Sequence, residues 1–424
     1  MTILPAKRRS SVTSCKHSAT PRTAYVLAIA VAAIACGGRD VTMDTVTPSA
    51  AAADRILTDL GVHRSDALAR VPISPLPPPK RASIDSFRLV GGILDGGEHL
   101  VVLDERREPH LVRSARRAGS TTQRVLPHVL AERDSLRPVA VAMHATSQGR
   151  AVVVLDARRQ RLLSVDVGDA GFRRHFVQLD LRGVLDRSDN PQSIGAAPWG
   201  IALAGVMTGG TRVAYSRDLR SWEKFRDTAS VRFGFPVTSF ARSLAGSSLV
   251  LLHPNQQRAM LASAYHRSLW ILDLRNATSR VLQFDSTTRA PARLRRAADS
   301  SVRLTWDGSV RRHFMGAAAS SDYVALLDCD CRARDETPDD QTLIWLVDWQ
   351  GELIALLKAP TKLVHVGFGR DGRELLAAAK DGPWQRIVSW DLDERILRHR
   401  RAGAVSSAVK IAQSEKDNRT GDIP

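Results

Sequence analysis

The most unusual local sequence is the acidic, cysteine-bearing run DCDCRARDETPDD from Asp328 to Asp340. Its two thiols and six carboxylates are groups that bind divalent metals, and thiolates favour Zn²⁺. Cys329 and Cys331 lack the Cys-x-x-Cys spacing and have no histidine nearby, so they supply at most two soft ligands. In an extended strand their Cα atoms would lie about 7 Å apart, so a disulfide requires the chain to bend. A disulfide, unpaired thiols and a metal site are three interpretations of what we expect to be an exposed loop, and no metal ligand is assigned.

Two histidines have positions from which they could reach a central channel. His144 and His365 fall on strands that we expect to be the innermost strands of two repeated units. A histidine in a channel can act as a ligand or as a general base. No carboxylate stands at a fixed spacing from either residue, so a buried histidine with satisfied hydrogen bonds is the favoured interpretation.

The familiar catalytic and cofactor motifs are absent from the sequence. It has no His-Glu-x-x-His, no phosphate-binding P-loop, no Gly-x-Gly-x-x-Gly that opens a helix and no Gly-x-Ser-x-Gly. We therefore assign no catalytic residue and no cofactor.

The N-terminal residues have the pattern of an export signal. Residues 1–35 contain five basic residues and no acidic one, and an apolar stretch of twelve residues spans Ala24–Ala35. Such a stretch suits the core of a secretory signal and is too short to cross about 30 Å of hydrocarbon as a helix. The sequence Ala33-Ile34-Ala35-Cys36 resembles a bacterial lipobox, in which the cysteine accepts the lipid. It departs from the usual pattern at Ala33, where leucine is common, and it also fits an ordinary A-x-A cleavage site or an uncleaved anchor.

The composition then changes twice along the chain. We expect residues 1–35 to be a lipoprotein signal peptide. We expect residues 36–83 to be an Ala/Pro-rich tether with one or two short helices, and the prolines of SPLPPPK favour an extended spacer there. Residues 84–400 alternate short β-rich runs with turns, and residues 401–424 form a polar tail.

An internal repeat selects the architecture of residues 84–400. Val101-Val102-Leu103-Asp104 recurs 52 residues later as Val153-Val154-Leu155-Asp156, and further apolar runs follow at steps of about 50 residues. A period of 40–50 residues with four short strands per unit is typical of a propeller blade. The sequence predicts an all-β, six-bladed β-propeller, with seven blades as the alternative.

Several segments carry a resemblance to a known superfamily. FGRDGRELLAAAKDGPWQRIVSWDL (Phe368–Leu392) is similar to a blade of the TolB-like propellers, with its Asp-Gly turn and its apolar third strand. Ser268–Leu274 and Leu343–Leu357 share the third-strand pattern. The resemblance implies a six-bladed propeller lipoprotein of the bacterial envelope, and it implies a fold and no particular activity.

The net charge of +17 comes from 61 basic and 44 acidic residues. The basic residues are scattered among acidic ones, and no nucleic-acid motif is present, so nucleic acid is not an expected partner. We expect a monomer anchored through Cys36 in the cell envelope, facing the periplasm or the exterior. It would bind an envelope protein, peptide or glycan without being an enzyme. The alternative is a metal-dependent envelope hydrolase or lactonase with its site in the channel.

Overall fold

The computed structural model describes the chain in segments, all of which belong to the compact unit that begins at Thr42. The described residues are 43–48, 53–87, 90–95, 99–104, 111–116, 123–124, 138–146, 149–168, 171–227, 247–284, 292–296, 302–306, 311–332 and 342–392. The expected signal peptide (residues 1–35), Cys36 and the polar tail (residues 401–424) lie outside them. No helix within these segments is long and apolar enough to cross a membrane.

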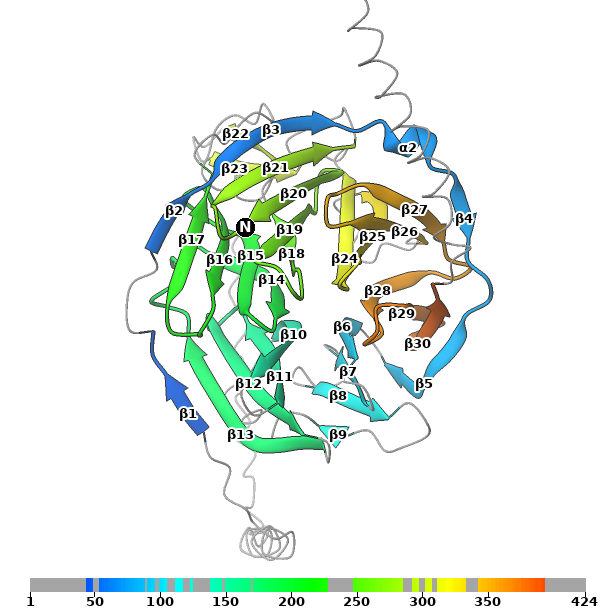
Figure 1. Cartoon of the computed structure of the whole chain (residues 1–424), viewed down its shortest axis with the longest axis horizontal. Helices are drawn as coiled ribbons and strands as arrows, with labels where there is room; N and C mark the ends of the chain where they lie inside the picture. The colour runs from blue at the N-terminus through cyan, green and yellow to red at the C-terminus, as the bar shows by residue number, and fades with distance from the viewer. Residues whose placement is uncertain are drawn as a thin grey trace, which may run out of the picture. The chain divides into compact units, whose positions relative to one another are not determined.

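The chain folds as a β-propeller, in which short antiparallel sheets surround a central channel (Figure 1). Five blades consist of four consecutive strands each. The first is β6 (Val90–Asp95), β7 (His99–Asp104), β8 (Leu111–Arg116) and β9 (Gln123–Arg124); the second is β10 (Pro138–Thr146), β11 (Gly149–Asp156), β12 (Arg161–Gly168) and β13 (Gly171–Asp180). The third is β14 (Asn190–Ala197), β15 (Gly200–Val206), β16 (Thr211–Ser216) and β17 (Trp222–Arg226). The fourth is β18 (Ser248–Leu252), β19 (Arg258–Ser263), β20 (Ser268–Asp273) and β21 (Thr278–Gln283), and the fifth is β24 (Arg311–Ala319), β25 (Tyr323–Arg332), β26 (Leu343–Asp348) and β27 (Leu353–Lys358).

The remaining large sheet combines two distant parts of the chain. Its first three strands are consecutive, β28 (Leu363–Phe368), β29 (Glu374–Asp381) and β30 (Trp384–Asp391), and its fourth is β5 (Lys80–Phe87). β5 pairs antiparallel with β30, with Phe87 opposite Gln385. The expectation of six blades, each made from its own stretch of sequence, is therefore corrected to five, because the last sheet takes its outer strand from near the N-terminus.

The segment that we expected to be a tether is instead largely a belt of strands. Here β1 (Met43–Val46), β2 (Ala53–Ile56), β3 (Thr58–Arg64) and β4 (Ile73–Pro75) each pair parallel with the outermost strand of one blade, β13, β17, β21 and β27 in that order. The one helix described in this segment, α2 (Ala67–Arg70), has four residues. The outer strands offer unpaired backbone groups, and pairing with them outweighs the local helical spacing of the apolar residues.

The buried side chains form one cluster at each junction between neighbouring large sheets. Each sheet exposes two apolar faces, so it needs a neighbour on both sides. Tryptophans fill several junctions, with Trp345 and Trp349 between the fourth and fifth blades. A separate two-stranded hairpin, β22 (Ala292–Arg296) and β23 (Val302–Trp306), lies in the chain between the fourth and fifth blades.

The cluster that joins the composite sheet to the first blade can be tested through Phe87. This side chain is fully buried, and Phe87→Ala should lower the free energy of unfolding by about 3–5 kcal/mol because it leaves a cavity at the closure of the ring. Chemical denaturation measures the loss. Ile56→Ala on β2 is the control, since Ile56 is 65% exposed and its truncation should change stability by less than about 1 kcal/mol. Equal effects of the two substitutions would contradict the proposed importance of this junction.

Candidate functional site

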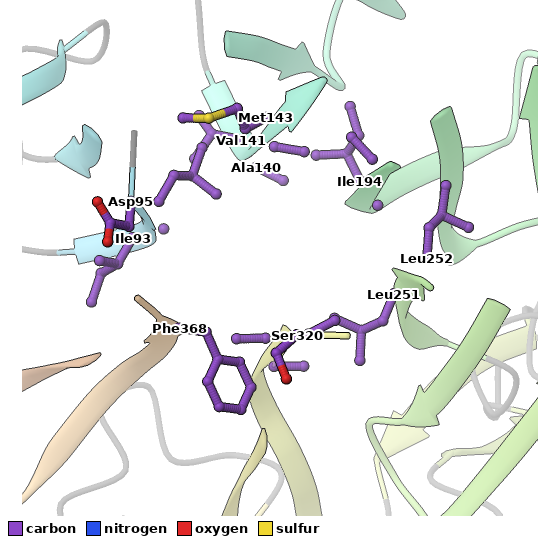
Figure 2. Close-up of a pocket in the computed structure, with 18 of the residues that line it drawn as sticks. Ile93, Asp95, Ala140, Val141, Met143, Ile194, Leu251, Leu252, Ser320 and Phe368 are labelled. Carbon is purple, nitrogen blue, oxygen red and sulfur yellow. The ribbon is translucent and has the colours of Figure 1, made fainter. Parts of the chain in front are cut away.

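The central channel contains a cavity of about 650 Å³. It is lined by the innermost strand of every large sheet, namely β6, β10, β14, β18, β24 and β28. Figure 2 shows that mainly apolar side chains surround it, among them Ile93, Val141, Met143, Ile194 and Phe368. An apolar interior of this kind favours an apolar group of a ligand over a charged one.

The mouth of the cavity is more polar than its interior. It is formed by the turns that follow the innermost strands and includes Asn255, Ser321 and Asp371. Asp95, at the end of β6, accepts a hydrogen bond from the backbone N–H of Arg370 (2.8 Å), which links the first blade to the composite sheet. The rim therefore offers hydrogen-bonding groups above an apolar channel.

One rim turn requires a glycine. The Asp371-Gly372 turn predicted from the sequence joins β28 to β29, and Gly372 has φ of +70°. A Cβ atom at this position would lie 2.8 Å from Cβ of Ser320 in the β24–β25 turn. Only glycine accepts both this conformation and this close approach, so the two turns stay in contact at the mouth.

His365, one of the two predicted channel histidines, is on β28 among the residues that line the cavity, and it is half-buried. Burial removes water from its imidazole and lowers its pKa to about 4. Gly316 on β24 faces the ring, and a Cβ atom there would lie 3.4 Å from His365 Nδ1, an ordinary van der Waals contact. His365 is therefore neutral near pH 7 and can donate or accept a hydrogen bond. His144 is on the innermost strand of its blade, β10, where it pairs with Ala151. Its side chain is not among those that the structure describes.

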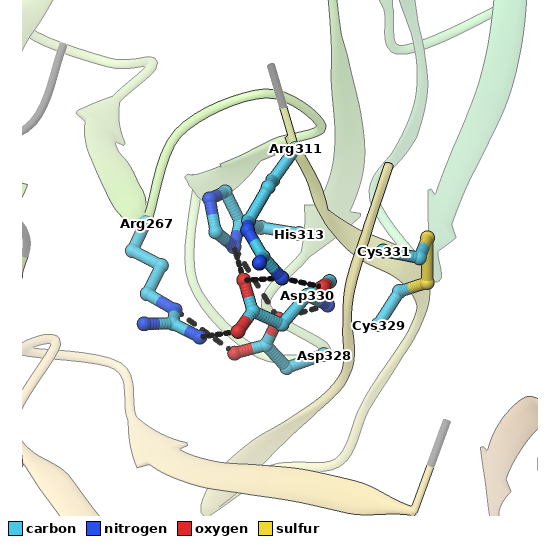
Figure 3. Close-up of a disulfide and its surroundings, with 7 residues drawn as sticks. All are labelled: Arg267, Arg311, His313, Asp328, Cys329, Asp330 and Cys331. Carbon is cyan, nitrogen blue, oxygen red and sulfur yellow. Dashed lines mark hydrogen bonds and ion pairs between the residues drawn. A yellow bond between two sulfur atoms is a disulfide. The ribbon is translucent and has the colours of Figure 1, made fainter. Parts of the chain in front are cut away.

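The second candidate region is an ion cluster at the far ends of the strands (Figure 3). Asp328, at most 2% exposed, lies 3.1 Å from Arg267 Nε and 3.5 Å from His313 Nδ1, and it accepts a hydrogen bond from Trp345 Nε1 (3.0 Å). Burial raises the pKa of Asp328, but the contact with His313 and the charge of Arg267 outweigh that effect and hold the pKa below its ordinary value. This carboxylate is therefore a charged anchor between two blades.

The two cysteines lie beside this cluster and are joined by a disulfide, with their Cα atoms 5.0 Å apart. Asp330 stands between them with φ of +47°, which supplies the bend that a straight strand lacks. Its carboxylate lies 3.4 Å from Arg267 and 3.5 Å from Arg311. Arginine counterions therefore neutralise Asp328 and Asp330, the two acidic residues of the segment that the structure describes.

The exposed loop that we expected from Asp328 onward is corrected in its first part. β25 continues through Arg332, Arg312 pairs with Cys331, and Cys329 is only 6% exposed. Pairing with β24 and the arginine counterions allow an acidic segment to extend the strand. Residues 333–341 are outside the description. No group of three or more His, Cys, Asp or Glu side chains within the described ranges could hold a metal ion.

Sequence reasoning missed the partners in this cluster. Arg267 is in the β19–β20 turn of the neighbouring blade, 61 residues before Asp328. His313 is not part of any recognisable sequence motif. No local spacing connects these residues, because packing between blades brings Arg267 to Asp328 and the pairing of β24 with β25 brings His313 there.

The pH dependence of stability tests the environment of His365. Its pKa is about 4 in the folded protein and near 6.5 when exposed, so between these values the unfolded chain binds more protons than the folded one. The free energy of unfolding should therefore fall as the pH is lowered from 6.5 to 4, by up to about 1.4 kcal/mol per pH unit. His365→Gln should lose this component, as measured by denaturation across that range. Identical slopes for the two proteins would contradict a desolvated imidazole.

Comparisons with known proteins reveal a likeness in fold only. No protein-family model matches the chain, and no curated protein matches it. Among solved structures, the chain is similar to the RRP9 WD40 repeats, at 10% identity over 74% of this chain and 99% of that chain with a TM-score of 0.44. It is also similar to the β-propeller domain of Cps50 (Swd1) from Myceliophteria thermophila, at 10% identity over 73% and 99% with a TM-score of 0.40. A third is the hydrazine synthase of Kuenenia stuttgartiensis, at 13% identity over 76% and 98% with a TM-score of 0.36. At these identities the likeness concerns the β-propeller fold alone.

Proposed function

We propose that this protein is a lipid-anchored β-propeller of the cell envelope that binds a protein, peptide or glycan at the mouth of its channel. The observation that carries the proposal is the cavity of about 650 Å³, apolar inside and polar at its rim. Concave sites with an apolar lining and a few polar groups are the usual form of a binding site.

The ring geometry supports recognition at this mouth. The rim residues sit on tight turns between paired strands, such as the turn that ends at Gly372. A preformed rim loses little conformational entropy when a ligand binds, and that cost otherwise weakens affinity. An apolar side chain or sugar face entering the channel, with polar neighbours on the rim, matches this distribution of groups.

The lipid anchor would hold the propeller close to a membrane. Acylation of Cys36 is supported by the basic leader, the apolar stretch and the small residues before the cysteine. Seven peptide units connect Cys36 to Met43, where β1 begins. An extended chain covers about 3.5 Å per residue, so the start of the belt would stay within roughly 25 Å of the acylated cysteine.

We also propose that the composite sheet acts as a sixth blade of a TolB-like propeller. The three segments that resemble third strands of that superfamily correspond to β20, β26 and β30, and each is the third strand of its sheet. Completion of the last sheet by β5 would close the ring with hydrogen bonds between distant parts of the chain.

Cys36→Ala tests the lipid anchor. The substitution removes the thiol that accepts the lipid, so the protein should move from the membrane fraction to the soluble fraction of its host. Cys15→Ala is the matched control, since it precedes the apolar stretch and should leave the protein in the membrane fraction. A Cys36→Ala protein that still sediments with membranes, or a wild-type protein that is already soluble, would count against acylation.

Bulky substitutions at the rim test the binding site. Ser321 and Asn255 are exposed at the mouth, and the double variant Ser321→Trp/Asn255→Trp should obstruct it without disturbing the core. We expect at least a tenfold loss of the partner recovered by cross-linking and affinity capture from the native envelope. Pro383→Trp, in the exposed turn at the other end of β29, should retain the partner. Equal recovery with the rim variant and the control would overturn the assignment of the mouth.

A further inference from the structure

A second cavity, of about 1100 Å³, lies at the other end of the strands from the channel mouth. β11 connects the two regions, because Arg150 near its start lines the channel cavity and the turn after Asp156 lines the second cavity. Five arginines line it, against two aspartates: Arg158, Arg159, Arg161, Arg182 and Arg187, with Asp180 and Asp189. We call this region the arginine groove.

Backbone contacts hold the walls of the arginine groove together. The Gln160 side chain donates hydrogen bonds to the carbonyl oxygens of Asp186 (3.0 Å) and Asp189 (3.1 Å). The backbone N–H of Leu181 donates to the carbonyl of Gln160 (2.7 Å). The turn that carries Arg158 and the loop that carries Arg187 are therefore fixed relative to each other before any ligand binds.

The acidic residues of the groove are engaged with protein groups. Asp189 is buried and accepts hydrogen bonds from the backbone N–H (2.6 Å) and hydroxyl (2.7 Å) of Thr208. Asp180 lies 2.9 Å from Arg182 Nε. Neither carboxylate is placed to neutralise Arg158 and Arg187, which are both exposed.

The floor of the groove is anchored by a buried ion pair. Arg161, only 8% exposed, lies 3.2 Å from Asp156, and its Nη1 is 3.5 Å from Gln178 Oε1. Burial and pairing fix this guanidinium in position, so the exposed arginines stand above a rigid base. Two of the five groove arginines, Arg161 and Arg182, are paired with Asp156 and Asp180, so the repulsion that a multivalent anion relieves on binding is that between the exposed guanidiniums, Arg158 and Arg187 among them.

We propose that the arginine groove binds a ligand with two or more phosphate groups. A guanidinium presents paired donors that match phosphate oxygens, and arginine is the side chain that recognises phosphate in this bidentate manner. Spaced guanidiniums on a fixed frame select linked phosphates over a single one, because each additional phosphate adds contacts within the same cavity. This site is separate from the channel mouth, and the inference does not rest on the proposed function.

The test measures binding of tripolyphosphate to the full chain by calorimetry. We expect binding that is at least tenfold tighter than that of orthophosphate and that weakens as salt is raised. Arg158→Glu/Arg187→Glu should weaken it at least tenfold. The matched control is Arg220→Glu/Arg275→Glu, which makes the same charge change at two exposed arginines outside the groove and should weaken binding less than threefold.

A second arm identifies the source of the phosphate groups. Vesicles of cardiolipin, whose headgroup carries two phosphate groups, and phosphatidylcholine replace tripolyphosphate, with pure phosphatidylcholine as the reference. Groove-dependent binding to tripolyphosphate supports a soluble ligand, and groove-dependent binding only to the anionic vesicles supports a lipid headgroup. Equal losses in the two double variants, or no binding in either arm, would overturn the proposal. Thermal unfolding of each variant checks that the fold is intact.

Discussion

Closure of the ring is the constraint on which the rest of this propeller depends. Each sheet is apolar on both faces, so the first blade and the last sheet must cover each other or leave a core open to water. Phe87 is buried in the cluster between them, and the backbone N–H of Val90 donates a hydrogen bond to Gln385 Oε1 (2.7 Å). The pairing of β5 with β30 thus joins residues about 300 positions apart, and the channel exists because this joint is made.

The belt addresses a different problem, the exposed outer edges of the blades. An outermost strand offers unpaired backbone groups that could pair with another molecule. The belt strands cover four of these edges, and Leu57 and Leu76 insert from the belt into two junction clusters. The large hydrophobic side chains that are exposed among the described residues all belong to the belt, and they are Ile56, Leu60 and Ile73. The segment therefore stabilises the blades while connecting them to the N-terminal residues.

The two ends of the channel differ in chemistry. The mouth combines neutral polar groups with charges of both signs, among them Asp95, Arg370 and Asp371, whereas the opposite ends of the strands hold arginines next to buried aspartates. Asp156 ends the second strand of its blade and Asp328 lies within the second strand of the fifth blade, and their counterions are Arg161 and Arg267. Some of the basic residues are thus structural counterions, and the arginine groove is where exposed guanidiniums gather.

The sequence by itself determined the all-β class, the repeat and the Asp371-Gly372 turn, because each depends on local alternation or spacing. It also placed His365 on an innermost strand, since that strand reads as a short apolar run. Only the tertiary structure decided the belt, the strand through Cys329 and Cys331, and the pairing of Arg267 with Asp328. These features depend on hydrogen bonds and ion pairs between segments far apart in the chain. The local sequence does not predict such partners, because only folding brings them into contact.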